Sequence, residues 1–288
     1  MSIIKIGSRK SQLAIKQTEA VIKKLKEHFP NDTFEIVGIS TKGDRQLDKS
    51  LQSFGGKGVF IKEIETALLS GEIDMAVHSA KDMPTEICDG LTISAALLRD
   101  DRSDVLVHFG DTKLSDIKII GTGSARRQSQ AEKLFPNAVF KPIRGNIGTR
   151  LEKAKNGEYD AVIMARAAIN RLAVSDIKVE NLGDNFICAA GQGILAIETA
   201  VGKADKYAQA INDKVAMTEL KCERAFLQYT GGGCHAACGA SAEFNGKEIK
   251  MCTFFKENDK EIYLEMFGND PILLGKKMAE ITLDKIKE

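Results

Sequence analysis

A short apolar stretch, Ile73–Val77, constrains the fold more than any other part of the sequence. Asp74 is its only polar residue, so the stretch is apolar enough to be a strand buried on both faces. Such strands are typical of α/β folds, in which helices cover both sides of the sheet. The charged pair Lys81 and Asp82 follows within a few residues. Because ligands bind at the carboxyl edge of open α/β sheets, Asp82 is a candidate site residue, and a solvated loop pair is the alternative.

Length and composition narrow the class of protein. A chain of 288 residues predicts about two domains, or three small ones. The net charge of +1 argues against a general nucleic-acid binder, so any basic site must be local. No apolar run approaches the length of a membrane span, and the first residues lack the apolar core of a signal peptide. The six cysteines are therefore interpreted as reduced thiols, and we expect a cytoplasmic protein with no membrane contact.

The first turn of the chain resembles an anion-binding site. The apolar strand Ile3–Ile6 is followed by Gly7–Ser11, which leads into an amphipathic helix. The first amides of a helix have no partner within the helix and attract anions, and Arg9 adds positive charge there. The alternative, compatible with a site, is simple helix capping by Ser8 or Ser11.

Two stretches of the first half recur in the second half. Ile6–Gln12 resembles Gly123–Gln130, and Gly71–Val77 resembles Gly157–Val162. Both pairs fall at matching places, a strand-to-helix turn and the start of a strand. The repetition predicts two related lobes, with a ligand in the cleft between them.

Positive charge is concentrated in one segment, Gly121–Arg150, which has a single acidic residue, Glu132. Its basic residues are Arg126, Arg127, Lys133, Lys141, Arg144 and Arg150. The arginines stand on loops at glycine-rich helix starts, where guanidinium forks can bind carboxylates or phosphates. This pattern favours a polyanionic ligand over a solvated basic face. Nucleic-acid binding would require more interleaved aromatic residues than Phe135 and Phe140.

The remaining pattern completes an α/β chain with a long loop. Thr41–Gly58 is polar and glycine-rich. It is not a Walker A loop, because Gly58 follows Lys57 where that loop has serine or threonine. We interpret it as a mobile, basic active-site flap. Helices are expected at Phe60–Leu69, closed by Gly71, around Arg171, at Val215–Tyr229 and from about Pro271. Strands are expected at Phe34–Ser40, Leu91–Leu98, Val105–Val107, Ile117–Ile120, Ala138–Ile143, Glu158–Ala165, Phe186–Ala190 and Ile194–Thr199, with three short strands before the last helix and a hinge at Gly191–Gly193.

Cys234 is the second candidate site residue, because it follows three consecutive glycines. Such a loop exposes a cysteine and allows a bulky group to approach the backbone. The cysteines in or beside apolar elements, Cys88, Cys188, Cys222 and Cys252, are expected to be core residues. A metal site of Cys234, His235 and Cys238 would lack a second ligand pair, and a Cys-His nucleophilic pair on adjacent residues seldom aligns, so no metal is predicted.

Taken together, these stretches resemble the hydroxymethylbilane synthase (porphobilinogen deaminase) family over essentially the whole chain. The matching stretches are G-S-R-K-S, T-K-G-D, G-G-K-G, V-H-S-A-K-D-M-P, R-R-Q, R-G-N-I-G-T-R, G-E-Y-D-A, G-Q-G and G-G-G-C, in this order. The resemblance departs at Gly123, where the family usually has serine, and at His235–Cys238, where it usually has Q-V-P-[IV].

The resemblance implies an α/β fold of two lobes like those of type II periplasmic binding proteins, with mixed sheets, and a small α+β C-terminal domain. The first lobe would comprise residues 1–99 and 194–213, the second residues 100–193, and the third domain residues 214–288.

The resemblance also implies an enzyme, a transferase of tetrapyrrole biosynthesis. Four porphobilinogen molecules would condense, with loss of ammonia, onto a dipyrromethane cofactor held by a thioether to Cys234, and water would release the linear tetrapyrrole. Asp82 would be the catalytic residue. Cofactor-binding residues would be Lys81, Ser124, Arg126, Arg127, Arg144 and Arg150; substrate-binding residues would be Arg9, Ser11, Arg144, Arg150 and Arg171. We expect a monomer that binds neither metal nor nucleic acid.

The types of residue present fit this chemistry, independently of the family resemblance. One carboxylate can accept the pyrrole N–H and stabilise the cation formed when ammonia leaves, and several arginines can bind the acetate and propionate arms. The alternative is a two-lobed protein that binds a small anion without chemistry, which gives Cys234 no role.

Overall fold

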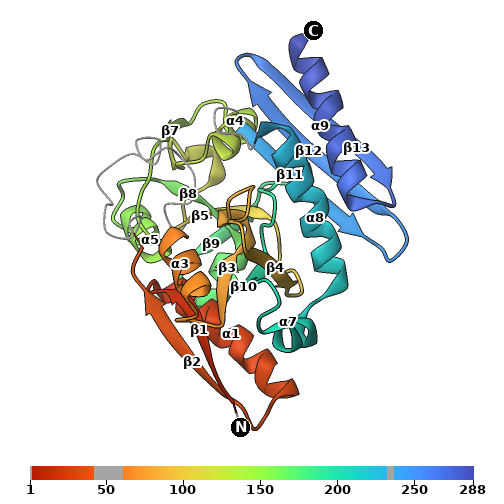
Figure 1. Ribbon diagram of the computed structural model, residues 1–288. Helices are drawn as coiled ribbons and strands as arrows, with labels where there is room; N and C mark the ends of the chain where they lie inside the picture. Colours follow the sequence, from red (N-terminus) through yellow and green to blue (C-terminus); the bar gives the residue numbers. More distant parts are fainter. Residues whose placement is uncertain (1, 42–60, 232–236) are drawn as a thin grey trace. The chain divides into compact units, whose positions relative to one another are not determined.

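The computed structural model describes residues 2–41, 61–231 and 237–288 (Figure 1). Most of the predicted flap, together with Cys234 and His235, lies outside the described residues. The chain forms two compact units. One consists of Met1–Arg99 and Ile194–Leu220, and the other of Asp100–Gly193 and Lys221–Glu288.

The first unit is built on a five-stranded mixed sheet in the order β2-β1-β3-β10-β4. Its strands are β1 (Ile3–Arg9), β2 (Thr33–Ile39), β3 (Met75–Ser79), β4 (Leu91–Ala96) and β10 (Leu195–Ala200). Strands β1, β2 and β3 are parallel, whereas β10 runs antiparallel to both of its neighbours. The carboxyl ends of β1 and β3 therefore lie at the same edge of this sheet.

Helices cover both faces of this sheet, as the apolar stretch predicted. α1 (Gln12–His28) and α7 (Asp205–Ile211) pack on one face, where Leu25 and Tyr207 share a core with Met75. α3 (Lys62–Ser70) packs on the other face through Ile64 and Leu68. Strand β3 begins two residues later than predicted. Asp74 lies just before it, where its backbone N–H donates to the carbonyl of Lys5 at 2.9 Å and its carboxylate accepts the N–H of Lys5 at 2.8 Å.

The second unit contains a sheet of the same design, in the order β7-β6-β8-β5-β9. The strands are β5 (Asp104–His108), β6 (Ile119–Gly121), β7 (Val139–Lys141), β8 (Ala161–Ala165) and β9 (Lys178–Asn181), and the helices are α4 (Ala125–Leu134), α5 (Ile147–Lys155) and α6 (Arg166–Leu172). Strands β6, β7 and β8 are parallel, and β5 is antiparallel to β8 and β9. The amino end of β5 consequently lies beside the carboxyl end of β8, with Asp104 opposite Ala165.

The predicted repetition is confirmed by this shared strand order. The parallel triplets β1, β2, β3 and β6, β7, β8 are arranged alike, with the first strand in the middle. The Asp160 carboxylate accepts the backbone N–H groups of Lys118 and Ile119 at 2.8 Å, as that of Asp74 accepts Lys5. Two α/β lobes of one design are therefore present, one in each unit.

The second unit also contains the predicted small α+β domain. Strands β11 (Ala237–Phe244), β12 (Ile249–Glu257) and β13 (Lys260–Gly268) form an antiparallel sheet. Figure 1 shows α9 (Pro271–Lys287) along this sheet, together with α8 (Lys214–Tyr229), which belongs to this unit from Lys221 on. Phe226 of α8, Met251 of β12 and Met278 of α9 are fully buried in its core. The fold-class prediction is thus confirmed.

Two local expectations were wrong. Phe186–Ala190 is buried but is not a strand, because side chains satisfy its backbone: the N–H of Ile187 donates to Gln130 Oε1 at 2.8 Å. Cys88 is exposed and not a core residue, since it lies in the turn that precedes β4, where its carbonyl accepts the N–H of Leu91.

Candidate functional site

Asp82 lies where the sequence predicted, directly after β3. It ends a short 3₁₀ helix, η2 (Ala80–Asp82), and its side chain is exposed. The turn is fixed by hydrogen bonds from Ala80 N–H to the carbonyl of Ile194 at 3.0 Å and from Met83 N–H to the carbonyl of Ala80 at 3.3 Å. An exposed carboxylate on a backbone-anchored turn at the carboxyl edge of a sheet can meet a ligand without rearrangement.

The predicted cationic turn after β1 reaches the same edge. Ser11 caps α1, since its hydroxyl accepts the N–H of Ala14 at 3.3 Å, which selects Ser11 over Ser8 as the cap. The Gln17 side chain donates to Ser79 Oγ at 2.9 Å and so ties the first turns of α1 to the end of β3. Arg9, Ser11, Lys81 and Asp82 are therefore brought to one edge of the sheet in the first unit.

In the second unit the predicted arginines follow three neighbouring parallel strands. Ser124 caps α4 after β6, and its hydroxyl accepts the N–H of Arg127 at 3.3 Å. Arg144 is exposed in the turn between β7 and α5. Arg150 Nε donates to the carbonyl of Gly145 at 2.9 Å. Gly145 has a φ of 109°, and a Cβ atom there would lie 2.7 Å from Thr149, so this tight turn requires glycine.

Arg171, at the end of α6, is held by the backbone that leads out of this unit. Its Nη2 donates to the carbonyl of Gly193 at 2.5 Å, and its Nε lies 3.4 Å from Asp100 Oδ2. Burial lowers the pKa of its guanidinium below the usual value, and the negative charge of Asp100 opposes part of that effect.

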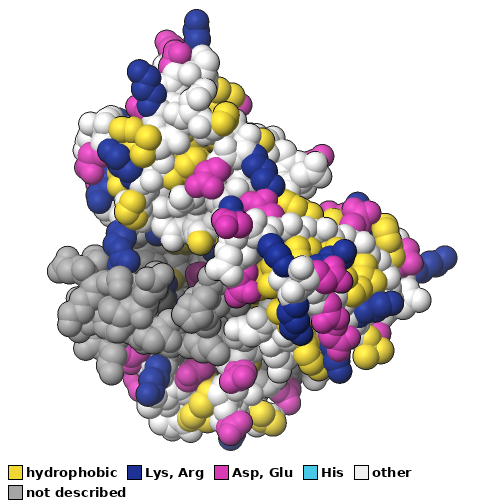
Figure 2. Space-filling model, turned by 90° about the horizontal axis from the view of Figure 1, so that it is seen from above, with side chains coloured by type: hydrophobic (Ala, Val, Ile, Leu, Met, Phe, Trp, Pro, Cys, Tyr) yellow, Lys and Arg dark blue, Asp and Glu magenta, His cyan; other side chains and the backbone are white. Residues whose placement is uncertain are grey.

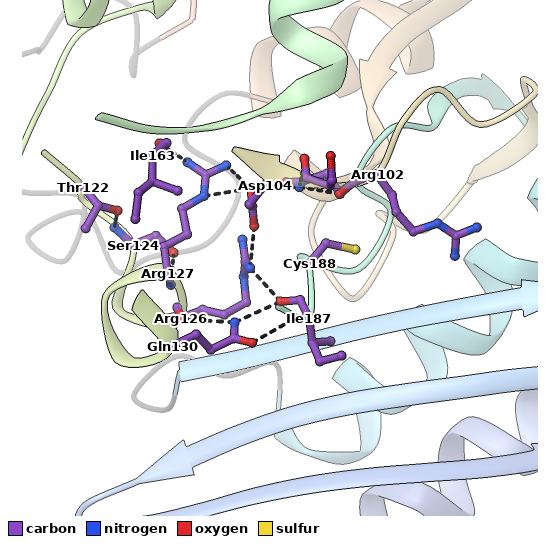
Figure 3. Close-up of polar contacts among 12 residues, drawn as sticks. Arg102, Asp104, Thr122, Ser124, Arg126, Arg127, Gln130, Ile163, Ile187 and Cys188 are labelled. Carbon is purple, nitrogen blue, oxygen red and sulfur yellow. Dashed lines mark hydrogen bonds and ion pairs between the residues drawn. The ribbon is translucent and has the colours of Figure 1, made fainter. Parts of the chain in front are cut away.

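Arg126 and Arg127 have a different environment from the one expected. They occupy the first turn of α4, not a loop, and are only 6% and 8% exposed. Figure 3 shows both guanidinium groups turned toward the Asp104 carboxylate. Arg126 Nη1 donates to Oδ2 at 2.7 Å, whereas Arg127 donates to Oδ1 through Nε at 3.0 Å and Nη2 at 2.7 Å. Both guanidinium groups are thus part of a buried ion cluster.

Two domain models of one protein family match the chain. The porphobilinogen deaminase, dipyromethane cofactor binding domain matches residues 4–208, and the porphobilinogen deaminase, C-terminal domain matches residues 217–284. The chain belongs to the porphobilinogen deaminase family. Two named relatives have similar lengths. The porphobilinogen deaminase of Bacillus subtilis is 43% identical over 99% of this chain and 94% of its own, and that of Lachnospira eligens is 42% identical over 96% and 98%.

Among solved structures, likeness is distant. An ancestral cationic amino acid solute binding protein is 13% identical with a TM-score of 0.45, covering 73% of this chain and 86% of its own. The BenM effector binding domain is 14% identical with a TM-score of 0.42, covering 80% and 94%.

Membership of the porphobilinogen deaminase family confirms the predicted transferase activity in tetrapyrrole biosynthesis and the predicted dipyrromethane cofactor domain. On the face seen in Figure 2, basic and acidic side chains of the described residues are interspersed, which agrees with the low net charge. Within the described residues, no helix is long and apolar enough to cross a membrane.

The thiols of the porphobilinogen deaminase chain differ strongly in environment. Burial raises the pKa of Cys238 to about 12, although a bond with Thr230 and the charge of Arg126 oppose the shift. Burial, aided by nearby Glu223, raises the pKa of Cys222 to about 12, and burial with Glu265 raises that of Cys252 to about 11. Each of these three is a neutral, weakly nucleophilic thiol at neutral pH.

Sequence reasoning missed the buried acidic residues of this family member, among them Asp104 and Glu198. Asp104 carries no motif of its own, and its two arginine partners follow 22 and 23 residues later. Glu198 of β10 is fully buried, and its Oε2 lies 3.0 Å from Nε2 of His78 on β3. An acidic residue inside an apolar strand, as in L-A-I-E-T-A, is the signal that could have identified Glu198, because a charge is rarely buried without a partner.

Proposed function

We propose that Asp82 is the catalytic carboxylate of the porphobilinogen deaminase reaction in this chain and that Cys234 carries the dipyrromethane. The observation that supports this proposal most strongly is the position of Asp82. It is exposed at the carboxyl edge of its sheet, at the same edge as Ser11, the N-cap of α1. Within the sequence, Cys234 is the cysteine that follows three glycines. The neutral thiols of Cys222, Cys238 and Cys252 make poor competitors for a covalent bond.

The residues present fit a cofactor that bears several carboxylates. Arg126 forms both of its hydrogen bonds through Nη1, to Asp104 and to the carbonyl of Ile187, each at 2.7 Å. Its Nε and Nη2 form no hydrogen bond with any of the residues that the structure describes. These two atoms make up the side-on fork that binds a carboxylate through two parallel hydrogen bonds. Lys81, Ser124, Arg127, Arg144 and Arg150 complete the proposed cofactor-binding set.

When bound, the dipyrromethane supplies a pyrrole with a free α-carbon to which the next pyrrole is joined. Asp82 accepts the pyrrole N–H of porphobilinogen and stabilises positive charge on the ring as ammonia leaves. The backbone hydrogen bonds of η2 hold Asp82 so that little reorganisation is needed at that moment. Arg9, Ser11, Arg144, Arg150 and Arg171 bind the acetate and propionate arms of the substrate.

A protein that binds a small anion without chemistry is the alternative. It would account for the arginine turns but not for the exposed Asp82 carboxylate at the same sheet edge as Arg9, which would repel an anionic ligand. The family match also favours the enzyme. A monomeric state and a cytoplasmic location stay predictions from the sequence.

Replacement of Asp82 tests the proposed role. Asp82→Asn should turn over porphobilinogen slower by about a hundredfold or more, because the amide accepts the N–H bond but carries no charge. Asp82→Glu keeps the charge one methylene away and should retain more activity than Asn. Single-turnover rates are measured beside the unfolding temperature, which should change little for an exposed side chain. An Asn variant with parental turnover, or a Glu variant slower than Asn, would remove Asp82 from the mechanism.

A further inference from the structure

The Asp104 carboxylate is the centre of a buried cluster that contains two arginines. It is the first residue of β5, and its side chain is 0% exposed. It accepts one hydrogen bond from Arg126, two from Arg127 and one from Gln192 Nε2 at 2.9 Å. One carboxylate thus faces two guanidinium groups, and Gln192 adds no charge.

The two arginines use Asp104 in different ways. Arg127 directs its side-on fork, Nε and Nη2, at Asp104 and donates its Nη1 to the carbonyl of Ile163 at 2.9 Å. Arg126 instead uses only its end nitrogen Nη1 and keeps the side-on fork for another partner. Asp104 therefore occupies the side-on fork of Arg127. It also holds the end nitrogen of Arg126 and so fixes the direction of the Arg126 fork.

Neutral groups hold the rest of the cluster in place. Gln130 Nε2 donates to the carbonyl of Ile187 at 3.0 Å, and its Oε1 accepts the N–H of the same residue at 2.8 Å. The Arg126 side chain is also confined next to its guanidinium, since a Cβ atom on Gly239 of β11 would lie 3.0 Å from Arg126 Cδ. The guanidinium of Arg126 thus has few alternative rotamers as long as Asp104 holds its end.

We infer that Asp104 is a positioning residue for cofactor loading: it aims the open fork of Arg126 at a ligand carboxylate. This inference rests on the proposed role of Arg126 as a ligand of the dipyrromethane.

The test compares two neutralised buried acids in the same unit. Asp104→Asn places amide hydrogens against guanidinium donors, so the Arg126 fork loses its orientation. Glu223→Gln is the matched control, because Glu223 is also fully buried and accepts the backbone N–H groups of Gly191 at 2.6 Å and Ala242 at 2.8 Å. Both variants should lower the unfolding temperature.

The readout is the covalent mass gained when cofactor-free protein, made in cells that cannot synthesise porphobilinogen, is exposed to graded porphobilinogen concentrations. Folded Asp104→Asn should load about tenfold slower or more, with a higher half-saturating concentration, whereas Glu223→Gln should load at the parental rate. Equal loading by Asp104→Asn and the parent, or equal slowing of both variants, would overturn the inference.

A second variant covers the case in which Asp104→Asn does not fold. Asp104→Glu keeps the charge but shifts the carboxylate by one methylene, so it should fold and load about threefold slower or more. Parental loading by folded Asp104→Glu would then overturn the inference. A parent chain that gains no mass would contradict the proposed function itself, which separates the two failures.

Discussion

Arginines that follow the paired strands β6 and β7 differ at the level of single residues. Arg127 is buried and donates three hydrogen bonds, two to Asp104 and one to the carbonyl of Ile163. Arg144 is exposed in the turn before α5. The same charge and the same kind of sequence position therefore have different consequences when they are removed.

Arg127→Leu should destabilise the chain by about 1–3 kcal/mol, because it removes two hydrogen bonds to the buried Asp104 carboxylate, which keeps its bond from Arg126. Arg144→Leu should change stability by no more than about 0.5 kcal/mol, since its side chain is exposed, yet it should still hinder cofactor loading. Denaturant unfolding of both variants, with intact mass measured in parallel, tests this contrast. An Arg127→Leu chain as stable as Arg144→Leu would show that the ion cluster contributes little.

At the scale of elements, α3 lies against a buried acid of the sheet. Glu65 of α3 has a raised pKa, first because burial disfavours its charge and then because Glu198 repels it; His78 and Lys62 oppose the shift. A raised pKa means that the folded chain binds the Glu65 proton more tightly than the unfolded chain does. Protonation of Glu65 therefore stabilises the folded state at low pH. That advantage is lost as the pH rises through the folded-state pKa.

Glu65→Gln should therefore be more stable than the parent at pH 7, where the parent must keep Glu65 ionised against Glu198. The difference should disappear at a pH below about 4, where Glu65 is protonated in folded and unfolded chains alike. Unfolding temperatures of both chains, measured from pH 3 to 8 at intervals of about 0.5 pH units, test the sign of this stability difference. Glu72→Gln, at an exposed position next to α3, is the control and should follow the parent throughout. A Glu65→Gln chain less stable than the parent at pH 7 would contradict this account.

The sequence predicted elements well where apolar pattern and turn chemistry agreed. Gly71 ends α3 with a φ of 74°, as expected of a glycine cap, and the apolar stretch before Asp82 is a strand buried on both faces. Phe186–Ala190 was misjudged because buried apolar segments resemble strands whenever side chains replace the ladder bonds, as Gln130 does there. The strand Lys178–Asn181 was missed because, as a short edge strand, it has no continuous apolar run.

For the whole molecule, the sequence predicts which turns carry the site residues but not which side chains contact one another. Parallel strands in each lobe place Asp82, Ser124 and Arg144 after carboxyl strand ends, which follows from the strand-turn-helix pattern alone. The partner of Arg126 could not be predicted, because Asp104 reaches it only through the antiparallel pairing of β5 with β8. Register between distant strands depends on packing of the whole sheet and is not encoded locally.

The most direct test of the central claim is peptide mapping of the covalent mass on the purified chain. The described thiols offer internal controls: Cys88 is exposed, and Cys238 is a neutral thiol with a pKa of about 12. Digestion and mass spectrometry should place the added dipyrromethane on Cys234, with both control cysteines unmodified, and Cys234→Ala should gain no mass. An adduct on Cys88 or Cys238, or full turnover of porphobilinogen by a chain without an adduct, would contradict the account.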